Sequence, residues 1–236
     1  MKNFSSKMEK LYIEITDEMA EIFEKYYKLL VEKNKVMNLT AITDYDEVLL
    51  KQFYDSLSIV RTMDIKNVET VIDVGTGGGF PGIPLKIVFP HLKITLLDSL
   101  NKRIVWLNEV IEELDLKDIK AYHGRAEEFG HKDDYREQYD LCVSRAVANL
   151  STLSEYCIPF VKTNGYFVSY KAATVNEEVE TAKKSVKILG GDIKDICSFL
   201  LDDVDMERNL VKIQKVSKTP NKYPRKAGLP TKEPLV

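Results

Sequence analysis

Short runs of β-forming residues alternate with longer amphipathic stretches through most of the chain after residue 69. We predict strands at residues 70–74, 93–97, 119–122, 139–143, 165–170, 193–200 and 209–215. We predict helices between them at residues 82–88, 101–114, 149–161 and 174–188. Short apolar strands that alternate with helices form a mostly parallel sheet with helices on both faces. The last two strands have no helix between them, which predicts a terminal antiparallel hairpin.

The N-terminal part of the chain has a helical pattern instead. Apolar residues from Met19 to Leu30 recur at spacings of three and four, which is typical of an amphipathic helix. Thr16 precedes this helix and is a suitable N-cap. Asp44 is followed three residues later by Glu47, a capping-box pattern that predicts the start of a second helix.

These patterns divide the chain into three parts. We expect a helical cap at residues 1–68, a Rossmann-like α/β domain at residues 69–216 and a basic tail at residues 217–236. The tail contains four prolines, so we expect it to be irregular.

One stretch, residues 71–82, joins the first strand of the α/β domain to its first helix through a run of glycines. Its sequence is Val-Ile-Asp-Val-Gly-Thr-Gly-Gly-Gly-Phe-Pro-Gly. Glycine allows left-handed backbone angles and lets a ligand approach main-chain N–H groups closely. A helix that starts just beyond directs its free N–H groups and the positive end of its dipole at the same place. The stretch therefore predicts a nucleotide-type binding site.

Two kinds of ligand fit the spacing of these glycines. Gly77, Gly79 and Gly82 satisfy the dinucleotide pattern G-x-G-x-x-G. Residues 73–79, read as Asp-x-Gly-x-Gly-x-Gly, instead resemble the first motif of class I S-adenosylmethionine-dependent methyltransferases. We favour the second pattern because Phe80-Pro81 lies where a pyrophosphate would bind, and proline offers no N–H donor. The terminal hairpin is also typical of that fold and not of dehydrogenases.

Residues that follow the next strands should lie beside the glycine loop, because parallel strands direct their carboxyl ends to one edge of the sheet. Asp98 ends the second strand, where its carboxylate can accept hydrogen bonds from both ribose hydroxyls; capping of the next helix is the alternative role. Ser99 and Leu100 would line the adenine side of the site. The backbone at Ala126 and Glu127, after the third strand, would read the adenine edge, or would form only a structural turn.

A cation ends the fourth strand, in the sequence Ser144-Arg145-Ala146. Methyltransferases that act on amino groups commonly carry an Asn/Asp-Pro-Pro-Tyr type motif at this place. Arg145 therefore argues against an exocyclic amine as the target. An arginine suits a phosphate, a guanine edge or the carboxylate of methionine.

Composition narrows the class of protein. Of the 236 residues, 44% are hydrophobic and 30% are charged, which is ordinary for a globular protein. The net charge of −3 argues mildly against nucleic acid, so such a site must depend on local clusters. No apolar run reaches the roughly 18 residues of a membrane span, and we expect no secretory signal. Scattered cysteines and histidines predict a reduced, metal-free cytoplasmic protein, which we expect to be a monomer.

Several motifs together resemble one family. They are residues 73–85, residues 98–103 (Asp-Ser-Leu-Asn-Lys-Arg), Ser144-Arg-Ala, Lys171-Ala and Tyr223-Pro-Arg-Lys. As a set they are similar to the bacterial glucose-inhibited division protein B family, whose members methylate N7 of a guanine in 16S ribosomal RNA. The resemblance extends from Asn38 to the C-terminus. In two positions the chain departs from it, because Gln52 stands where a His is expected and Gly78 where Ala is usual.

The resemblance implies a set of residues that contact S-adenosylmethionine. They are Gly75, Phe80, Asp98, Ser99, Leu100, Ala126, Glu127 and Arg145, to which the glycine pattern adds Gly77 and Gly79. N7 of guanine has a free lone pair, so it can attack the methyl group without a general base. We therefore expect in-line transfer in which Arg145 and Lys171 hold the RNA backbone or guanine O6.

Basic side chains are expected to form the RNA-binding face. Besides the two residues just named, they are Lys102, Arg103, Arg125, Arg208, Lys218, Lys222, Arg225 and Lys226. Lys102 and Arg103 start a helix, where the dipole disfavours cations, and this favours a functional role. Tyr223 beside Arg225 offers stacking together with charge. The acidic stretch around Glu178 should lie on the opposite face.

Two other functions use the same features. A nicotinamide-dependent oxidoreductase could use the glycine turn, although no catalytic acid–base set accompanies it. A non-catalytic module could bind both S-adenosylmethionine and RNA, and only an assay of methyl transfer separates it from an enzyme.

Overall fold

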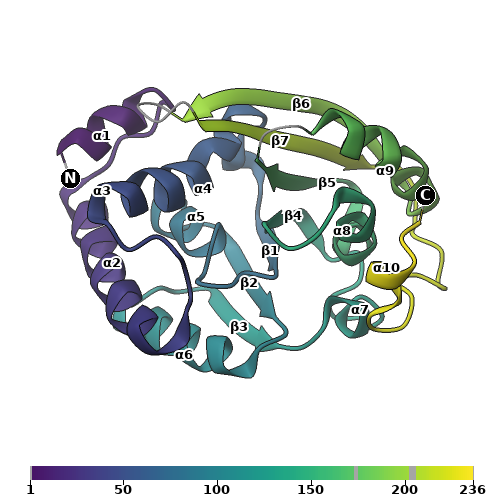
Figure 1. Ribbon diagram of the computed structural model, residues 1–236, viewed down its shortest axis with the longest axis horizontal. Helices are drawn as coiled ribbons and strands as arrows, with labels where there is room; N and C mark the ends of the chain where they lie inside the picture. Colours follow the sequence, from purple (N-terminus) through teal and green to yellow (C-terminus); the bar gives the residue numbers. More distant parts are fainter. Residues whose placement is uncertain (1, 173–174, 202–205, 236) are drawn as a thin grey trace.

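A seven-stranded mixed sheet runs through the centre of the computed structural model, which describes residues 2–172, 175–201 and 206–235 (Figure 1). The strands are β1 (Thr70–Val74), β2 (Lys93–Asp98), β3 (Ile119–His123), β4 (Tyr139–Arg145), β5 (Val161–Lys171), β6 (Gly191–Leu201) and β7 (Met206–Lys215). Their order across the sheet is β3-β2-β1-β4-β5-β7-β6. Strands β1 to β5 are parallel, whereas β7 is antiparallel to both β5 and β6. The predicted mostly parallel sheet with a terminal antiparallel hairpin is confirmed.

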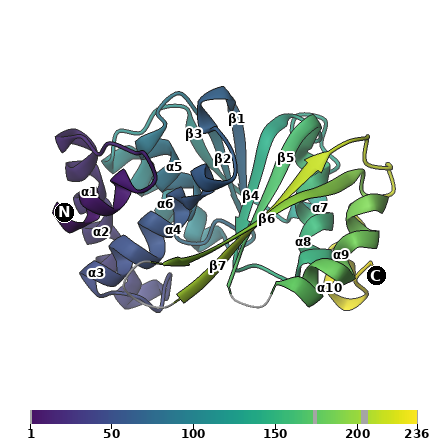
Figure 2. The ribbon, with the colours of Figure 1, turned by 90° about the horizontal axis from the view of Figure 1, so that it is seen from above.

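Helices cover both faces of the sheet, with α1 to α6 on one side and α7 to α10 on the other (Figure 2). The α-helices are α1 (Lys2–Glu9), α2 (Asp17–Met37), α3 (Tyr45–Val48), α4 (Asp55–Leu57), α5 (Gly82–Val88), α6 (Asn101–Glu113), α7 (Ala126–Phe129), α8 (Leu150–Cys157), α9 (Asn176–Ile188) and α10 (Leu229–Lys232). A π-helical segment (Leu49–Tyr54) joins α3 to α4. Short 3-10 turns occur at Ser58–Arg61, Ile65–Asn67 and Ile158–Phe160.

Each face of the sheet has its own hydrophobic core, because successive residues of a strand point to opposite faces. In β1, Val71 packs in the core that contains Phe23 of α2 and Phe53 of the π-helical segment. The next residue, Ile72, packs in the core that contains Leu153 of α8. The N-terminal helices therefore share a core with one face of the sheet.

Both N-terminal helix starts follow the predicted capping chemistry. The Thr16 hydroxyl accepts a hydrogen bond from the backbone N–H of Met19 at 3.2 Å, at the start of α2. The Asp44 carboxylate accepts one from the N–H of Glu47 at 3.1 Å, at the start of α3. Each cap satisfies one of the free N–H groups that a helix start leaves unpaired. The capping residues therefore fix where the chain enters each helix.

The order of strands reverses beside β1. The chain adds β2 and then β3 on one side of β1, and β4 then lies against the other side of β1. Such a reversal opens a crevice outside the carboxyl ends of the two central strands. The glycine loop after β1 and Arg145 at the end of β4 are thereby brought to the same crevice.

The C-terminal residues lie against α7 and α8 (Figure 1). The Arg136 guanidinium donates hydrogen bonds to the backbone carbonyls of Thr219 and Tyr223, each at 2.8 Å. Arg225 forms a bidentate pair with Glu155 of α8, whose side chain is fully buried. The tail was predicted to be irregular, but it contains the short helix α10 and is held by long-range hydrogen bonds.

Replacing Arg225 with methionine should lower the free energy of unfolding by about 3–5 kcal/mol, because Glu155 would stay buried without a counter-charge. The double variant Glu155→Gln, Arg225→Met should recover part of this loss, since no uncompensated charge is left. Lys226→Met, at an exposed neighbour, is the control and should change the value by less than about 0.5 kcal/mol. Urea denaturation measures all three. If Arg225→Met and Lys226→Met lowered the free energy of unfolding equally, the assignment of Arg225 as a structural residue would be contradicted.

Candidate functional site

The glycine loop after β1 has the left-handed backbone that its sequence predicts. Gly75, Gly77 and Gly79 have φ angles of 72°, 60° and 91°. The Asp73 carboxylate lies beneath the loop, where one oxygen accepts hydrogen bonds from the Thr76 hydroxyl at 2.7 Å and from the Gly82 N–H at 2.9 Å. One buried carboxylate therefore fixes both ends of the loop.

The first long helix, α2, supports this loop from the side of the N-terminal cap. The Tyr26 hydroxyl, which is fully buried, donates a hydrogen bond to the carbonyl of Gly78. The Tyr26 ring lies between the rings of Phe53 and Phe80, with centroid distances of 5.3 and 5.5 Å. A Cβ atom at Gly78 would lie 3.1 Å from the Phe80 ring, so glycine suits this close packing. The helical cap therefore shapes the cofactor loop directly.

Asp98 ends β2 beside the glycine loop, as predicted, and its side chain is only 3% exposed. Its Oδ2 atom accepts hydrogen bonds from the N–H of Gly77 at 2.9 Å and from Arg103 Nη1 at 3.2 Å. Its Oδ1 atom accepts one from the N–H of Leu100 at 2.9 Å. The carboxylate is thus aimed at the loop and is already paired with a cation.

The residues predicted for the adenine side follow β2 and β3, which are neighbours in the sheet. Ser99 and Leu100 are exposed, and Leu100 presents an apolar side chain that is 43% accessible. Ala126 and Glu127 are buried, and the Glu127 carboxylate accepts a hydrogen bond from the N–H of Gly228 in the C-terminal tail at 2.9 Å. The Glu127 side chain therefore holds the tail, and only its backbone is left for the predicted role.

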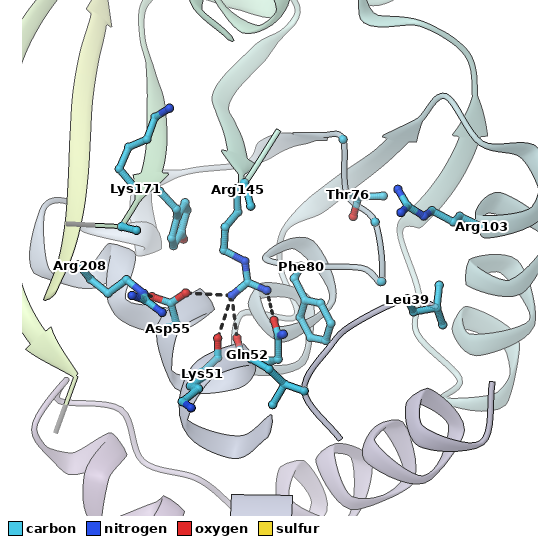
Figure 3. Close-up of a pocket in the computed structure, with 17 residues that line it drawn as sticks. Leu39, Lys51, Gln52, Asp55, Thr76, Phe80, Arg103, Arg145, Lys171 and Arg208 are labelled. Atoms are coloured by element: carbon cyan, nitrogen blue, oxygen red, sulfur yellow. Dashed lines mark hydrogen bonds and ion pairs between the residues drawn. The ribbon is translucent and has the colours of Figure 1, made fainter. Parts of the chain in front are cut away.

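A cavity of about 450 Å³ lies at the carboxyl ends of the central strands (Figure 3). Its lining residues are Leu39, Ile42, Lys51, Gln52, Asp55, Gly75, Thr76, Gly77, Gly78, Phe80, Arg103, Arg145, Ala146, Tyr170, Lys171, Ala172 and Arg208. The volume falls within the range of small-molecule sites. The cavity brings together two of the predicted loop glycines, Phe80 and four predicted cationic residues.

The Arg145 guanidinium is held on one wall of this cavity by acceptors from a single helical segment. Its Nη1 atom donates to the Asp55 carboxylate at 3.0 Å and lies 3.3 and 3.4 Å from the carbonyl oxygens of Lys51 and Gln52. Its Nη2 atom donates to the Gln52 side-chain oxygen, and the guanidinium lies 5.1 Å from the centroid of the Phe80 ring (Figure 3). Arg145 is thus fixed by the N-terminal cap.

Sequence reasoning missed Asp55 as a site residue. Its carboxylate is 4% exposed and lies between two arginines, with one oxygen on Arg145 and the other 3.3 Å from Arg208 Nε. Gln52 was noted only as a departure from the family; its amide donates to the Thr40 hydroxyl at 3.0 Å while its oxygen accepts from Arg145. An acid inside the apolar helical stretch 53–57 was the available signal for Asp55.

Lys171 lines the cavity, but its ammonium group has partners within the protein. Its Nζ atom donates to the Ala148 carbonyl at 2.7 Å and to Glu178 at 2.6 Å. In Figure 3 the side chain extends away from Arg145. The expectation that the acidic stretch around Glu178 lies on the opposite face is therefore wrong for Glu178, which neutralises a cation of the cavity.

The residues predicted to bind RNA divide into three groups. Arg103 and Arg208 line the cavity. The exposed residues are Lys102, Arg125, Lys218, Lys222 and Lys226. Tyr223, expected to stack on a base, is instead only 6% exposed, and the Arg225 guanidinium is instead paired with Glu155. The sequence predicted an irregular basic tail and did not reveal these internal partners, because they lie far away in sequence.

Burial dominates the electrostatics below the glycine loop. It raises the pKa of Asp73 to about 7, although hydrogen bonds from Thr76 and Gly82 act in the opposite direction. The second carboxylate oxygen of Asp73 has no hydrogen-bond partner among the described residues. Burial likewise raises the pKa of Tyr26, so its hydroxyl stays a donor to the loop.

The residues of this crevice fit S-adenosylmethionine. A Cβ atom at Gly77 would meet only the Gly75 carbonyl, at 4.0 Å, so the loop leaves open space above it. Asp98 offers carboxylate oxygens to a ribose diol. Arg145 lines the cavity with a half-buried guanidinium, a group suited to the carboxylate of the methionine moiety, and Asp55 balances its charge from behind. In the described parts of the chain, no group of three or more His, Cys, Asp or Glu side chains could hold a metal ion.

Comparison with protein families gives one match that covers most of the chain. The model of the GidB family, described as rRNA small subunit methyltransferase G, matches residues 19–215. A protein named ribosomal RNA small subunit methyltransferase G from Lachnoclostridium phytofermentans is 52% identical over 99% of this chain and 96% of its own length. Proteins of the same name from Bacillus licheniformis and Acetivibrio thermocellus are 50% and 54% identical, over 100% and 97% of this chain and 98% and 97% of their own lengths.

Solved structures with low sequence identity share the fold. An O-methyltransferase from a Brevibacillus brevis multienzyme, in complex with S-adenosyl-L-homocysteine, has a TM-score of 0.52 at 16% identity and covers 70% of this chain and 72% of that one. The TYW2 protein of P. horikoshii, in complex with MeSAdo, has a TM-score of 0.54 at 14% identity and covers 70% and 63%. The chain therefore has the class I methyltransferase fold. No helix among the described residues is long and apolar enough to span a membrane.

The variant Asp73→Asn should change how stability depends on pH. Between about pH 4 and pH 7 the unfolded wild-type chain releases the Asp73 proton while the native chain retains it, so its free energy of unfolding falls as pH rises. Asparagine cannot titrate, so the variant lacks this pH-dependent loss of stability. For the rise in the Asp73 pKa the loss amounts to roughly 4 kcal/mol. Urea denaturation across this window should show the difference between variant and wild type growing with pH and becoming constant above pH 7. A difference independent of pH would contradict the raised pKa.

Replacing Gln52 with histidine should make the hydrogen bond between residue 52 and Arg145 depend on pH. A neutral imidazole can accept from Arg145 with one nitrogen and donate to Thr40 with the other, whereas an imidazolium has no acceptor. We expect Gln52→His to melt close to wild type at about pH 8. Below about pH 6 it should melt roughly 2–10 °C lower, for a loss of about 1–3 kcal/mol.

Gln52→Ala is the matched control for this substitution, because it removes both hydrogen bonds at every pH. Its loss of melting temperature relative to wild type should therefore be the same at both pH values. A histidine variant that shows the same pH dependence as alanine would contradict the proposed contact with Arg145.

Proposed function

This chain belongs to the GidB family, rRNA small subunit methyltransferase G, and on this premise we propose that it transfers the methyl group of S-adenosylmethionine to N7 of a guanine in 16S ribosomal RNA. The observation that carries the proposal is the family match over residues 19–215, which includes the cavity and the segment that holds Arg145. The match also decides against the alternative of a nicotinamide-dependent oxidoreductase. Because the substrate is a ribosomal RNA, we place the protein in the cytoplasm.

The proposed cofactor site combines groups from four strand ends. S-adenosylmethionine supplies an electrophilic methyl group on a sulfonium. Asp98 would accept the ribose hydroxyls, and Arg145 would hold the methionine carboxylate. Ser99, Leu100 and the backbone at Ala126 and Glu127 are proposed to line the adenine. Gly75, Gly77, Gly79 and Phe80 form the loop between these two ends.

The chemistry proposed for the chain is positioning. Guanine N7 carries its own lone pair, so the attack needs no proton acceptor. Fixing the reactants in line and excluding water can supply on the order of 7–11 kcal/mol of the barrier reduction. The N7-methylated guanine gains positive charge, which a free cation nearby would oppose. Arg145 and Lys171 are each neutralised by an acid, Asp55 and Glu178, which suits a site that forms a cationic product.

Lys171 is therefore proposed as a positioning residue, and Arg145 as a cofactor-binding residue whose charge Asp55 already balances. Lys171 joins the end of β5 to the Ala148 carbonyl in the loop after β4, so it holds the wall opposite the glycine loop. The RNA backbone is proposed to meet Arg103 and Arg208 at the cavity and the exposed Lys102, Arg125 and Lys226 around it. Tyr223 and Arg225 are omitted from this face because they serve the packing of the tail.

The purified protein should incorporate tritiated methyl groups from S-adenosylmethionine into 16S RNA from cells that lack this methyltransferase. Borohydride and aniline treatment should then cleave the RNA at one guanine, because N7 methylation labilises that base. Asp98→Asn should lower transfer about 10- to 100-fold through lost hydrogen bonds to the ribose. Asp115→Asn, at an exposed acid remote from the crevice, is the matched control.

Two results would contradict this function. Cofactor binding without methyl transfer to any 16S substrate, including the assembled small subunit, would favour a non-catalytic module. Incorporation of label at a position that aniline does not cleave would retain the methyltransferase and exclude N7.

A further inference from the structure

Arg103 occupies a position on Asp98 that the cofactor would need. We propose that Arg103 couples cofactor binding to RNA binding: it pairs with Asp98 while the site is empty and turns to an RNA phosphate once ribose hydroxyls take its place. This inference rests on the proposed function, because it assumes that the crevice binds a nucleoside and that the substrate is RNA. It adds an order to the two binding events.

The hydrogen-bond capacity of Asp98 is the first step. An ionised carboxylate offers about four acceptor positions. Three of them are used, by the N–H groups of Gly77 and Leu100 and by Arg103 Nη1. A ribose diol brings two donors, so one of the existing partners must leave. The two backbone donors are fixed by the loop and by the helix start, whereas Arg103 is a flexible side chain.

Exposure shows which group can move. The Asp98 side chain is 3% exposed, while that of Arg103 is 29% exposed and also lines the cavity. In Figure 3 Arg103 lies beside Thr76, on the side of the cavity away from Lys171 and Arg208. Arg103 can therefore leave Asp98 by a change of rotamer without disturbing the sheet.

Charge explains where the released side chain would go. Asp98 is the one acid that pairs with Arg103 within the described residues, and the first turn of α6 contains no acidic residue. The start of a helix also carries a positive partial charge, which adds to that of Arg103 and of the neighbouring Lys102. Ribose hydroxyls that displace Arg103 from Asp98 would leave its guanidinium without a directly bound anion. An RNA phosphate is the anion that the proposed substrate offers.

The test measures the affinity of a 16S RNA substrate with and without saturating S-adenosylhomocysteine. This product lacks the sulfonium charge, so any gain in RNA affinity cannot come from a cation on the ligand. For the wild type we expect RNA to bind roughly 5- to 50-fold more tightly in its presence, with the reciprocal gain for the ligand. Calorimetry with the ligand and filter binding with the RNA give the two affinities independently of catalysis.

Three variants separate Arg103 from other causes. Arg103→Gln should reduce the coupling factor to about one, while its affinity for S-adenosylhomocysteine alone stays equal to or tighter than that of the wild type. Asp98→Asn should weaken the pair in the absence of ligand, so its RNA affinity without ligand should approach that of the ligand-saturated wild type. Lys117→Gln removes an exposed cation away from the crevice and should retain the wild-type coupling factor.

Two outcomes would overturn the inference alone. One is a wild-type coupling factor in Arg103→Gln, and the other is a loss of ligand affinity in that variant as large as its loss of RNA affinity. Absence of ligand binding by the wild type would instead overturn the proposed function, and this inference with it. Methyl transfer by the same wild-type preparation tells the two failures apart.

Discussion

The hydrogen bonds of one guanidinium, that of Arg145, join the N-terminal helices to the sheet. Arg145 ends a strand of the sheet, and its partners Lys51, Gln52 and Asp55 all belong to the N-terminal helices. A mostly buried cation needs both charge compensation and hydrogen bonds, and one helical segment supplies them together. Arg145 and its partners Lys51, Gln52 and Asp55 all line the cavity, so these contacts join the two elements at its wall. The N-terminal helices are thus part of the site and not an accessory to it.

Aromatic packing extends this connection to the start of the chain. Phe4 of α1 contacts Phe23 and Phe53, Tyr26 stacks on Phe53, and Phe80 of the cofactor loop completes the series. Buried aromatic pairs contribute area and preferred geometry at once. The Tyr26 hydroxyl ends the series with a hydrogen bond to the loop, so the conformation of the glycines depends on apolar packing that begins with the first helix.

Local features of the sequence predicted most of the fold. Both N-terminal caps, the glycine loop and the terminal hairpin depend on neighbours within a few residues, and the structure has them as expected. The bounds of the elements were less accurate: the helix predicted at residues 149–161 ends at Cys157, and β5 begins at Val161 instead of residue 165. The hydrogen bond between Arg145 and Gln52 could not be predicted, because these residues are 93 positions apart. The same holds for the tail, where Arg225 and Glu155 are 70 positions apart and composition alone predicted an irregular basic segment.

The anchored tail has a consequence for biosynthesis. Translation delivers Arg225 and Gly228 after every strand of the sheet has been made, yet Glu155 and Glu127 need them as partners. The buried site of Glu155 therefore cannot be neutralised before residue 225 has been synthesised. A chain that ended before Arg225 would have to bury Glu155 without a counter-charge or leave that part of the core unfolded.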